Sequence, residues 1–314
     1  MAGVFRLAFH RVALSRPRNI SKDWRWSLAV SDPSVGLFSG VFAASDGALI
    51  PYRVWPAHRP RALILLLHGA FDYSGAFDEI GPRLASTGLT AFAFDQRGFG
   101  ATASRGHWCG IERMTDDVGD ALGFLRARFG DQPAFIVGES MGADIAVRAI
   151  AAGNAGDIRG IVLAAPGAVT DAVRRLLWGC LIRLLGYFAP DSELGIERIK
   201  GTGLTAAGAI RLLCDPLVLR SLRPAMAAGL FELAVSAVPA ARQVSVPALT
   251  MIGSRENLIY SKCISRLHCA LSGHKTWRVF AGAPHHLLHW RHSKQVIDEV
   301  VAWIEARLGN QVSR

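Results

Sequence analysis

The chain has 314 residues, of which 51% are hydrophobic, and a formal net charge of +10. This content can form a large core, and the length suits one α/β domain with an insertion. No apolar run reaches the roughly 20 residues that span a bilayer. The basic residues are scattered and accompany no nucleic-acid-binding motif, so we expect no nucleic-acid partner. The positive charge instead favours solubility or contact with anionic lipid.

The five cysteines form no Cys-x-x-Cys pair and no Cys/His metal spacing. This pattern is typical of a reduced cytoplasmic protein, and we expect no bound metal.

Residues 1–37 are interpreted as a weakly ordered N-terminal leader, because their first part mixes apolar with basic residues and lacks the features of a secretory signal. Such a leader could rest on a membrane surface, so peripheral membrane association is left open. No pattern indicates the oligomeric state.

In chain order, strand patterns at 38–43 and 49–55 flank Ser45-Asp46-Gly47 and predict a β-hairpin. Beyond it, short apolar runs that are typical of buried strands alternate with helical patterns. The predicted strands are 62–67, 90–95, 134–138, 160–165, 248–253 and 276–280. The predicted helices are 77–86, 114–129, 143–152, 261–271 and 294–308. This alternation predicts an α/β fold with a mostly parallel central sheet and helices on both faces.

The alternation stops between residues 167 and 243, where the chain is apolar and rich in helical patterns. The predicted core is therefore divided into 38–166 and 244–314, with 167–243 inserted as a helical cap. Because the insertion follows a strand, it would cover the carboxyl edge of the sheet, where ligands bind in such folds. The alternative is a helical subdomain without a role in substrate binding.

An apolar strand leads into Gly138-Glu139-Ser140-Met141-Gly142, and a helical pattern follows at once. Glycines at Gly138 and Gly142 permit a sharp strand-to-helix turn that would expose the Ser140 hydroxyl. The Met141 amide would lie at a helix N-terminus, where N–H groups can stabilise an anion. The sequence therefore predicts a nucleophilic serine, the alternative being a glycine-rich turn with a bystander serine.

A serine nucleophile needs a base, and the base needs a third group to orient it. Glu256 follows one later strand, and His285, His286 and His289 follow the next. The order serine, acid, histidine predicts Glu256 as the acid and His285 as the base. The other two histidines are interpreted as packing or surface residues. The alternatives are a solvated Glu256 and a zinc site at the histidines, for which no partner with suitable spacing is evident.

The strand at 62–67 ends in His68-Gly69-Ala70. Glycine allows the backbone to turn inward, so the Ala70 amide could act as a second oxyanion donor beside Met141. His68 lies at a strand end before the serine, which favours an orienting or structural role for its imidazole.

These residues resemble the serine hydrolases of the α/β-hydrolase fold, and among them the monoacylglycerol lipase and lysophospholipase group of serine aminopeptidase S33-type hydrolases. The resemblance covers roughly residues 38–308. The motifs that carry it are Asp46-Gly47, His68-Gly69-Ala70, Asp95-Gln96-Arg97-Gly98-Phe99-Gly100, Gly138-Glu139-Ser140-Met141-Gly142, Asp215-Pro216-Leu217, Gly253-Ser254-Arg255-Glu256 and Ala283-Pro284-His285-His286-Leu287.

The resemblance implies Ser140 as nucleophile, Glu256 as acid and His285 as base, with the Ala70 and Met141 amides as the oxyanion hole. It also implies a lipid-facing helical cap and no cofactor. The chain departs from the family pattern at two positions. Glu256 stands where aspartate is usual. Asp144 stands where a small residue is typical, just after the sharp turn of residues 138–142 that we call the serine elbow.

The sequence thus predicts a hydrolase that cleaves carboxylic esters of single-chain lipids, such as monoacylglycerols or lysophospholipids, through an acyl-enzyme. One alternative is an aminopeptidase-like amide hydrolase, which would need an acidic residue in the cap to bind the substrate amine. The candidates for that role are Glu193, Glu197, Asp215 and Glu232. The other alternative is a binding protein that has kept the fold without activity.

Overall fold

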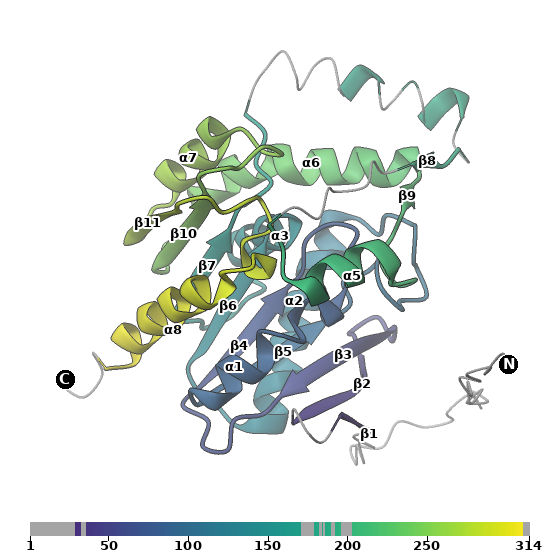
Figure 1. The fold of residues 1–314 in the computed structure, drawn as a ribbon. Helices are drawn as coiled ribbons and strands as arrows, with labels where there is room; N and C mark the ends of the chain where they lie inside the picture. The colour runs from purple at the N-terminus through teal and green to yellow at the C-terminus, as the bar shows by residue number, and fades with distance from the viewer. Residues whose placement is uncertain are drawn as a thin grey trace, which may run out of the picture.

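The structure is a computed structural model that describes residues 29–32, 36–170, 179–181, 184, 186–189, 192–195 and 203–309. Nine strands form one sheet in the order β1-β2-β3-β5-β4-β6-β7-β10-β11 (Figure 1). Their bounds are β1 Ala29–Asp32, β2 Leu37–Ala43, β3 Leu49–Trp55, β4 Ala62–Leu67, β5 Leu89–Phe94, β6 Ala134–Glu139, β7 Gly160–Ala164, β10 Ala248–Gly253 and β11 Lys275–Phe280.

The sheet is antiparallel at one edge and parallel elsewhere. Strands β1, β2, β3 and β5 pair antiparallel in succession, whereas all pairs from β5 to β11 are parallel. In the central strands β4, β5, β6 and β7 every residue is buried, which is characteristic of strands covered on both faces. The predicted architecture is therefore confirmed.

Helices cover both faces of the sheet (Figure 1). Helices α1 Gly81–Ser86 and α8 Ser293–Gly309 pack on one face. The other face carries α2 Ile111–Phe129, α3 Met141–Ala151, α6 Pro224–Ala241 and α7 Ser261–Ala270. Alternate side chains of β4 enter the two cores: Leu63 and Leu65 join one cluster, and Ile64 and Leu66 join the other.

The predicted hairpin, strands and most helices are confirmed, with ends that differ by up to three residues. The predicted helix at 77–86 is wrong in extent. A 3-10 turn, η2 Ser74–Phe77, comes first, and α1 begins only at Gly81. Pro82 lies in the first turn of α1, where its missing N–H costs no helical hydrogen bond. The Gly81-Pro82 pair in the sequence was the signal for this later start.

The sheet also begins earlier than the sequence indicates. Ala29–Asp32, within the region interpreted as a leader, forms β1 and pairs with β2, and Leu37 opens β2. Residues 1–28 and 33–35 lie outside the described part of the chain.

Within the inserted segment, the structure gives the full bounds of two short strands and two helices. These are β8 Leu194–Gly195, α5 Ala206–Cys214, β9 Ser221–Leu222 and α6. By length and composition alone α6 could cross a membrane. Its buried residues, which include Met226, Leu233 and Ala237, join the cluster that also contains α3 residues, as in a helix of a protein core. The division into core and cap stays a prediction.

Candidate active site

Ser140 occupies a sharp turn between β6 and α3. Its φ of 52° and ψ of −118° lie outside the regions that residues with side chains usually adopt, so the backbone here is strained. A Cβ at Gly142 would lie 2.2 Å from the carbonyl oxygen of Leu67, so only glycine allows α3 to approach the end of β4 this closely. The predicted elbow geometry is therefore present.

The structure brings Ser140, His285 and Glu256 into one chain of hydrogen bonds. His285 Nε2 lies 2.9 Å from Ser140 Oγ, and His285 Nδ1 lies 2.7 Å from Glu256 Oε2. The side chains of His285 and Glu256 are only 5% and 2% exposed, so water competes little for these bonds. With Nδ1 donating to the carboxylate, Nε2 is free to accept the serine proton.

The carboxylate of Glu256 is held by several donors. Its Oε1 accepts hydrogen bonds from the backbone N–H groups of Leu258 and Ile259, at 2.8 and 3.0 Å. Burial raises the pKa of Glu256, but the hydrogen bond and charge of His285, together with these backbone donors, bring the pKa below its ordinary value. Glu256 is therefore ionised at neutral pH and can stabilise a protonated His285.

Close packing of two loops brings Glu256 to His285. A Cβ at Gly253 would lie 2.1 Å from the Ala283 carbonyl oxygen, which any larger residue would displace. The loop after β10 therefore lies directly against the loop after β11. This contact explains how residues 29 positions apart meet.

The Ala70 and Met141 amides donate to no acceptor within the part of the chain that the structure describes. A Cβ built on Gly69 would be 3.5 Å from the Cβ of Ser140, so the loop carrying Ala70 passes beside the serine. Met141 is the first residue of α3, where a backbone N–H has no helical partner. Both amides are thus available to an oxyanion near Ser140.

His68 has the structural role that its position indicates. Its Nε2 accepts a hydrogen bond from the Gln96 backbone N–H at 3.0 Å, which leaves Nδ1 to donate to the Gly69 carbonyl at 2.8 Å. Burial lowers the pKa of His68. The neutral ring therefore ties the Ala70 loop to the loop that begins at Asp95.

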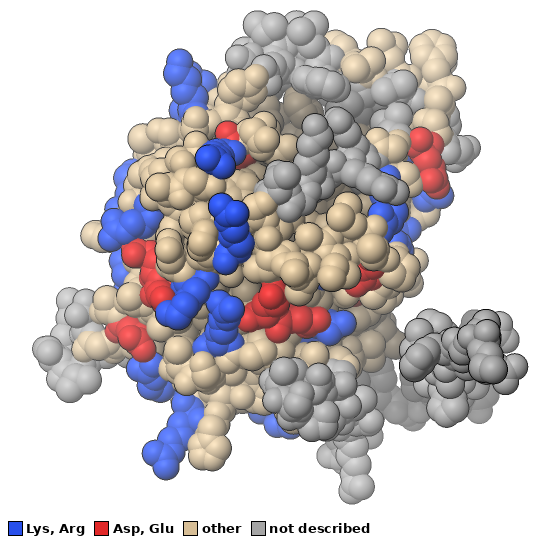
Figure 2. Space-filling model, viewed as in Figure 1, with Lys and Arg blue, Asp and Glu red and all other residues tan. Residues whose placement is uncertain are grey.

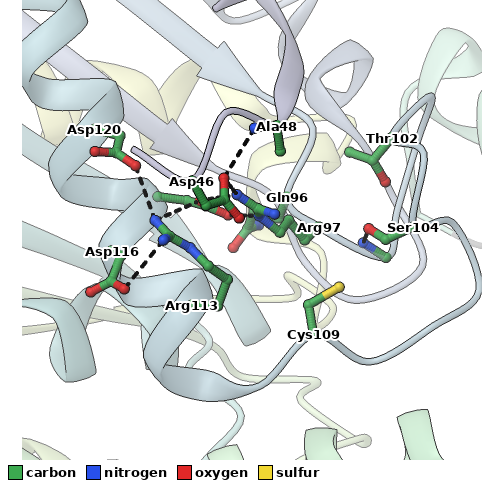
Figure 3. Close-up of polar contacts among 12 residues, drawn as sticks. Asp46, Ala48, Gln96, Arg97, Thr102, Ser104, Cys109, Arg113, Asp116 and Asp120 are labelled. Carbon is green, nitrogen blue, oxygen red and sulfur yellow. Dashed lines mark hydrogen bonds and ion pairs between the residues drawn. The ribbon is translucent and has the colours of Figure 1, made fainter. Parts of the chain in front are cut away.

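Beyond Gln96, an ionic network fixes the same loop to α2 and to the β2–β3 turn. Arg97 binds Asp117 through Nε at 2.7 Å and Asp46 through Nη2 at 2.8 Å. Figure 3 shows Arg97 beside Asp46, and Arg113 between Asp116 and Asp120. The hydrogen bond from Arg97 is the main cause of the pKa of about 2 at Asp46, whereas burial raises the pKa of Asp117.

Glu139 is a buried residue that the sequence analysis did not single out. Its Oε1 accepts a hydrogen bond from the Leu288 backbone N–H at 3.0 Å. Its Oε2 lies 3.4 Å from His289 Nε2 and 3.9 Å from His286 Nδ1. The two histidines thus pack against the carboxylate that precedes Ser140. Among the described residues, no group of His, Cys, Asp and Glu side chains is arranged to hold a metal ion.

Asp144, in the first turn of α3, is a second buried carboxyl beside the elbow. It accepts a backbone hydrogen bond from Gly167, and its Oδ1 has no partner within the described ranges. Burial raises the pKa of Asp144 well above its ordinary value, and the Gly167 N–H only partly opposes this. The carboxyl is therefore held in a site that favours its neutral form.

Three features together define an α/β-hydrolase fold. They are the order of the strands in the sheet, the serine elbow after β6, and the loops after β10 and β11 that bring Glu256 and His285 to Ser140. The family model described as serine aminopeptidase, S33, matches residues 58–290. The chain therefore belongs to that family.

Curated relatives and solved structures agree with this assignment. The monoacylglycerol lipase of Mycolicibacterium smegmatis is 28% identical over 275 residues, which cover 85% of this chain and 96% of the relative. The monoglyceride lipase of Mus musculus is 28% identical over 274 residues, which cover 84% of this chain and 89% of the relative. A crystal structure of Paleococcus ferrophilus monoacylglycerol lipase superposes with a TM-score of 0.70 at 21% identity, over 82% of this chain and 99% of the other.

Proposed function

We propose that the protein is a serine hydrolase that cleaves carboxylic esters of single-chain lipids, such as monoacylglycerols or lysophospholipids. The hydrogen-bond chain from Ser140 through His285 to Glu256 carries this proposal. The lipase names of the relatives support a lipid ester as the substrate. The segment 167–243, as a cap over the carboxyl edge of the sheet, would surround the acyl chain, and each methylene buried there would contribute about 0.8 kcal/mol.

In the first half of the reaction, Ser140 Oγ attacks the ester carbonyl carbon while His285 Nε2 takes its proton. The negative charge moves to the carbonyl oxygen, which the Ala70 and Met141 amides would bind; one such donor typically contributes about 3 kcal/mol. The charged imidazole is stabilised by Glu256. His285 then protonates the leaving alcohol, and the acyl group stays on Ser140.

In the second half, water replaces the alcohol. His285 takes a proton from this water, the hydroxide attacks the acyl carbon, and the fatty acid leaves as Ser140 regains its proton from His285.

We also propose that this reaction occurs in the cytoplasm, at or near a lipid surface.

The described residues offer no specific support for the alternative of amide cleavage. Two of the acidic residues that could bind a substrate amine already accept hydrogen bonds: Asp215 from the Tyr73 hydroxyl at 2.6 Å, and Glu193 from the Ser221 hydroxyl at 2.7 Å. Glu197 lies outside the described residues, and Glu232 is on α6.

A fluorophosphonate probe tests the nucleophile directly. We expect labelling of the wild type and none of Ser140→Ala, with both proteins folded by circular dichroism. A folded wild type that resists the probe would favour a binding protein without activity.

A second experiment separates ester from amide hydrolysis. It compares the turnover of p-nitrophenyl esters of increasing chain length with that of aminoacyl nitroanilides. A preference for the nitroanilides would contradict the proposed substrate class.

A further inference from the structure

We propose that a cavity beside strand β9 is a binding site for a phosphate group. The cavity has a volume of about 330 Å³, and three arginines contribute to its lining: Arg105, Arg220 and Arg223. Glu193 is the one carboxylate in the lining. The other walls are largely apolar and include Pro216, Val218, Leu219 and Leu222. The cavity thus combines a strongly cationic lining with a surface suited to the carbon skeleton of a lipid.

The three guanidinium groups have no carboxylate partner within the described ranges of the chain. Neutral acceptors orient them instead: the Pro216 carbonyl for Arg105 at 2.7 Å, the Leu213 carbonyl for Arg220 at 2.8 Å and the His107 imidazole for Arg223 at 2.7 Å. Glu193 is bound to the Ser221 hydroxyl. Among the described residues, the three arginines therefore outnumber the single carboxylate of the lining and form no ion pair with it.

An anion bound between cationic groups that line one cavity is attracted to each of them. Two of these guanidinium groups each keep two nitrogens without an acceptor among the described residues. These are Nε and Nη1 of Arg220, and Nε and Nη2 of Arg223. Guanidinium groups bind phosphate with pairs of parallel hydrogen bonds, and a phosphate has enough oxygens to engage more than one of them. Because the arginines are already oriented, less side-chain entropy is lost on binding.

The N-terminus of α6 adds to the positive potential. This 18-residue helix begins at Pro224, directly after Arg223, and its first turn contains no acidic residue. The positive end of the helix dipole therefore lies next to the arginines. In Figure 2, blue Lys and Arg side chains lie beside red acidic atoms at the upper right, where Figure 1 places β8 and β9.

One wall of the cavity connects to the proposed active site. The backbone N–H of Leu219 donates to the Phe71 carbonyl at 2.8 Å, and Phe71 follows Ala70. A phosphate in the cavity would thus lie close to the segment that carries the Ala70 amide. If the proposed function holds, the ligand is the phosphate-bearing head group of a single-chain lipid substrate; the same chemistry would also take inorganic phosphate.

The test uses the full chain and two probes. Isothermal titration measures binding of inorganic phosphate. Hydrolysis assays compare 1-dodecanoylglycerol with 1-dodecanoylglycerol-3-phosphate, which differ only in the phosphate. The variants are Arg220→Gln and Arg223→Gln, and the matched control is Arg242→Gln, which removes the same charge from an exposed position at the far end of α6.

We expect either cavity variant to weaken phosphate binding, and to raise the KM of the phosphate-bearing ester, by about tenfold, as for loss of one charge-assisted hydrogen bond. The KM of the neutral ester should stay within twofold for every variant, and Arg242→Gln should change nothing. Arginine-dependent binding of inorganic phosphate without any change in ester KM would assign the site to the free ion.

If neither phosphate nor the phosphate-bearing ester responds to Arg220→Gln or Arg223→Gln more than to Arg242→Gln, the proposed site is wrong. Failure of the proposed function would look different. In that case the wild type would hydrolyse neither ester and would resist the fluorophosphonate probe, while the phosphate titration would still report on the cavity.

Discussion

Glu139, the residue before Ser140, accepts a 3.0 Å hydrogen bond from the backbone N–H of Leu288, in the segment that follows His285. One buried carboxylate therefore joins the serine elbow to the loop of the proposed base. Burial raises its pKa, but the neighbouring His289 and His286 imidazoles hold the pKa well below its usual value. The carboxylate is thus ionised, and it holds the loop that follows His285 against the serine elbow.

Replacement of Glu139 should impair the alignment of His285. Gln keeps an acceptor for Leu288, whereas Ala leaves that N–H unpaired, so we expect Glu139→Ala to slow fluorophosphonate labelling about tenfold or more and Glu139→Gln to slow it less. Labelling rates, measured beside urea unfolding, separate positioning from stability. If Glu139→Ala unfolds more easily but is labelled at the wild-type rate, Glu139 has only a structural role.

The contrast between Ser140 and Glu139 shows what the sequence could and could not predict. The elbow is a local pattern in which adjacent residues determine both turn and helix, and Glu256 and His285 follow strands that could be counted along the chain. The partner of Glu139 is 149 residues away, and no periodicity marks it. Arg105 and Arg223 likewise line one cavity only because the chain folds, since they are far apart in the sequence. From the sequence alone, the basic residues are merely scattered.

Glu256 provides a second prediction, because its charge and its hydrogen-bonding geometry can be separated. Glu256→Gln presents an amide to His285 Nδ1, which can select the wrong tautomer, so kcat should fall about 10²- to 10⁴-fold. Glu256→Asp keeps the charge but shortens the side chain by one methylene and should retain more activity than Gln. Initial rates with a p-nitrophenyl ester provide the measurement. Equal activity of the Gln variant and the wild type would remove Glu256 from the proposed mechanism.

Arg97 supports a prediction about stability. Its partner Asp117 is 1% exposed. Arg97→Gln therefore leaves a buried carboxylate whose remaining cationic partner among the described residues is Arg113, 3.3 Å away. We expect the free energy of unfolding to fall by about 3 kcal/mol. The control, Arg278→Gln, breaks a pair with Glu299 in which the arginine is 51% exposed, and should cost less than about 1 kcal/mol. Similar losses for both variants in urea unfolding would contradict a stabilising role for the buried pair.

Asp144 gives a prediction about pH. Because the folded-state pKa of Asp144 is raised, the folded protein holds one more proton than the unfolded chain at pH values between the two pKa values. The contribution of Asp144 to wild-type stability should therefore decline as pH rises above about 4, the unfolded pKa of aspartate, by at most about 1.4 kcal/mol per pH unit. Asp144→Asn cannot ionise and avoids this loss.

The stability of Asp144→Asn relative to the wild type should accordingly increase from pH 4.5 to pH 7.5, as measured by urea unfolding at several pH values. Asp157→Asn, at an exposed position, is the control and should show no comparable trend. A pH-independent difference between Asp144→Asn and the wild type would mean that Asp144 is ionised in the folded protein. Its Oδ1 would then need a partner that lies outside the described residues, because none of those within them provides one.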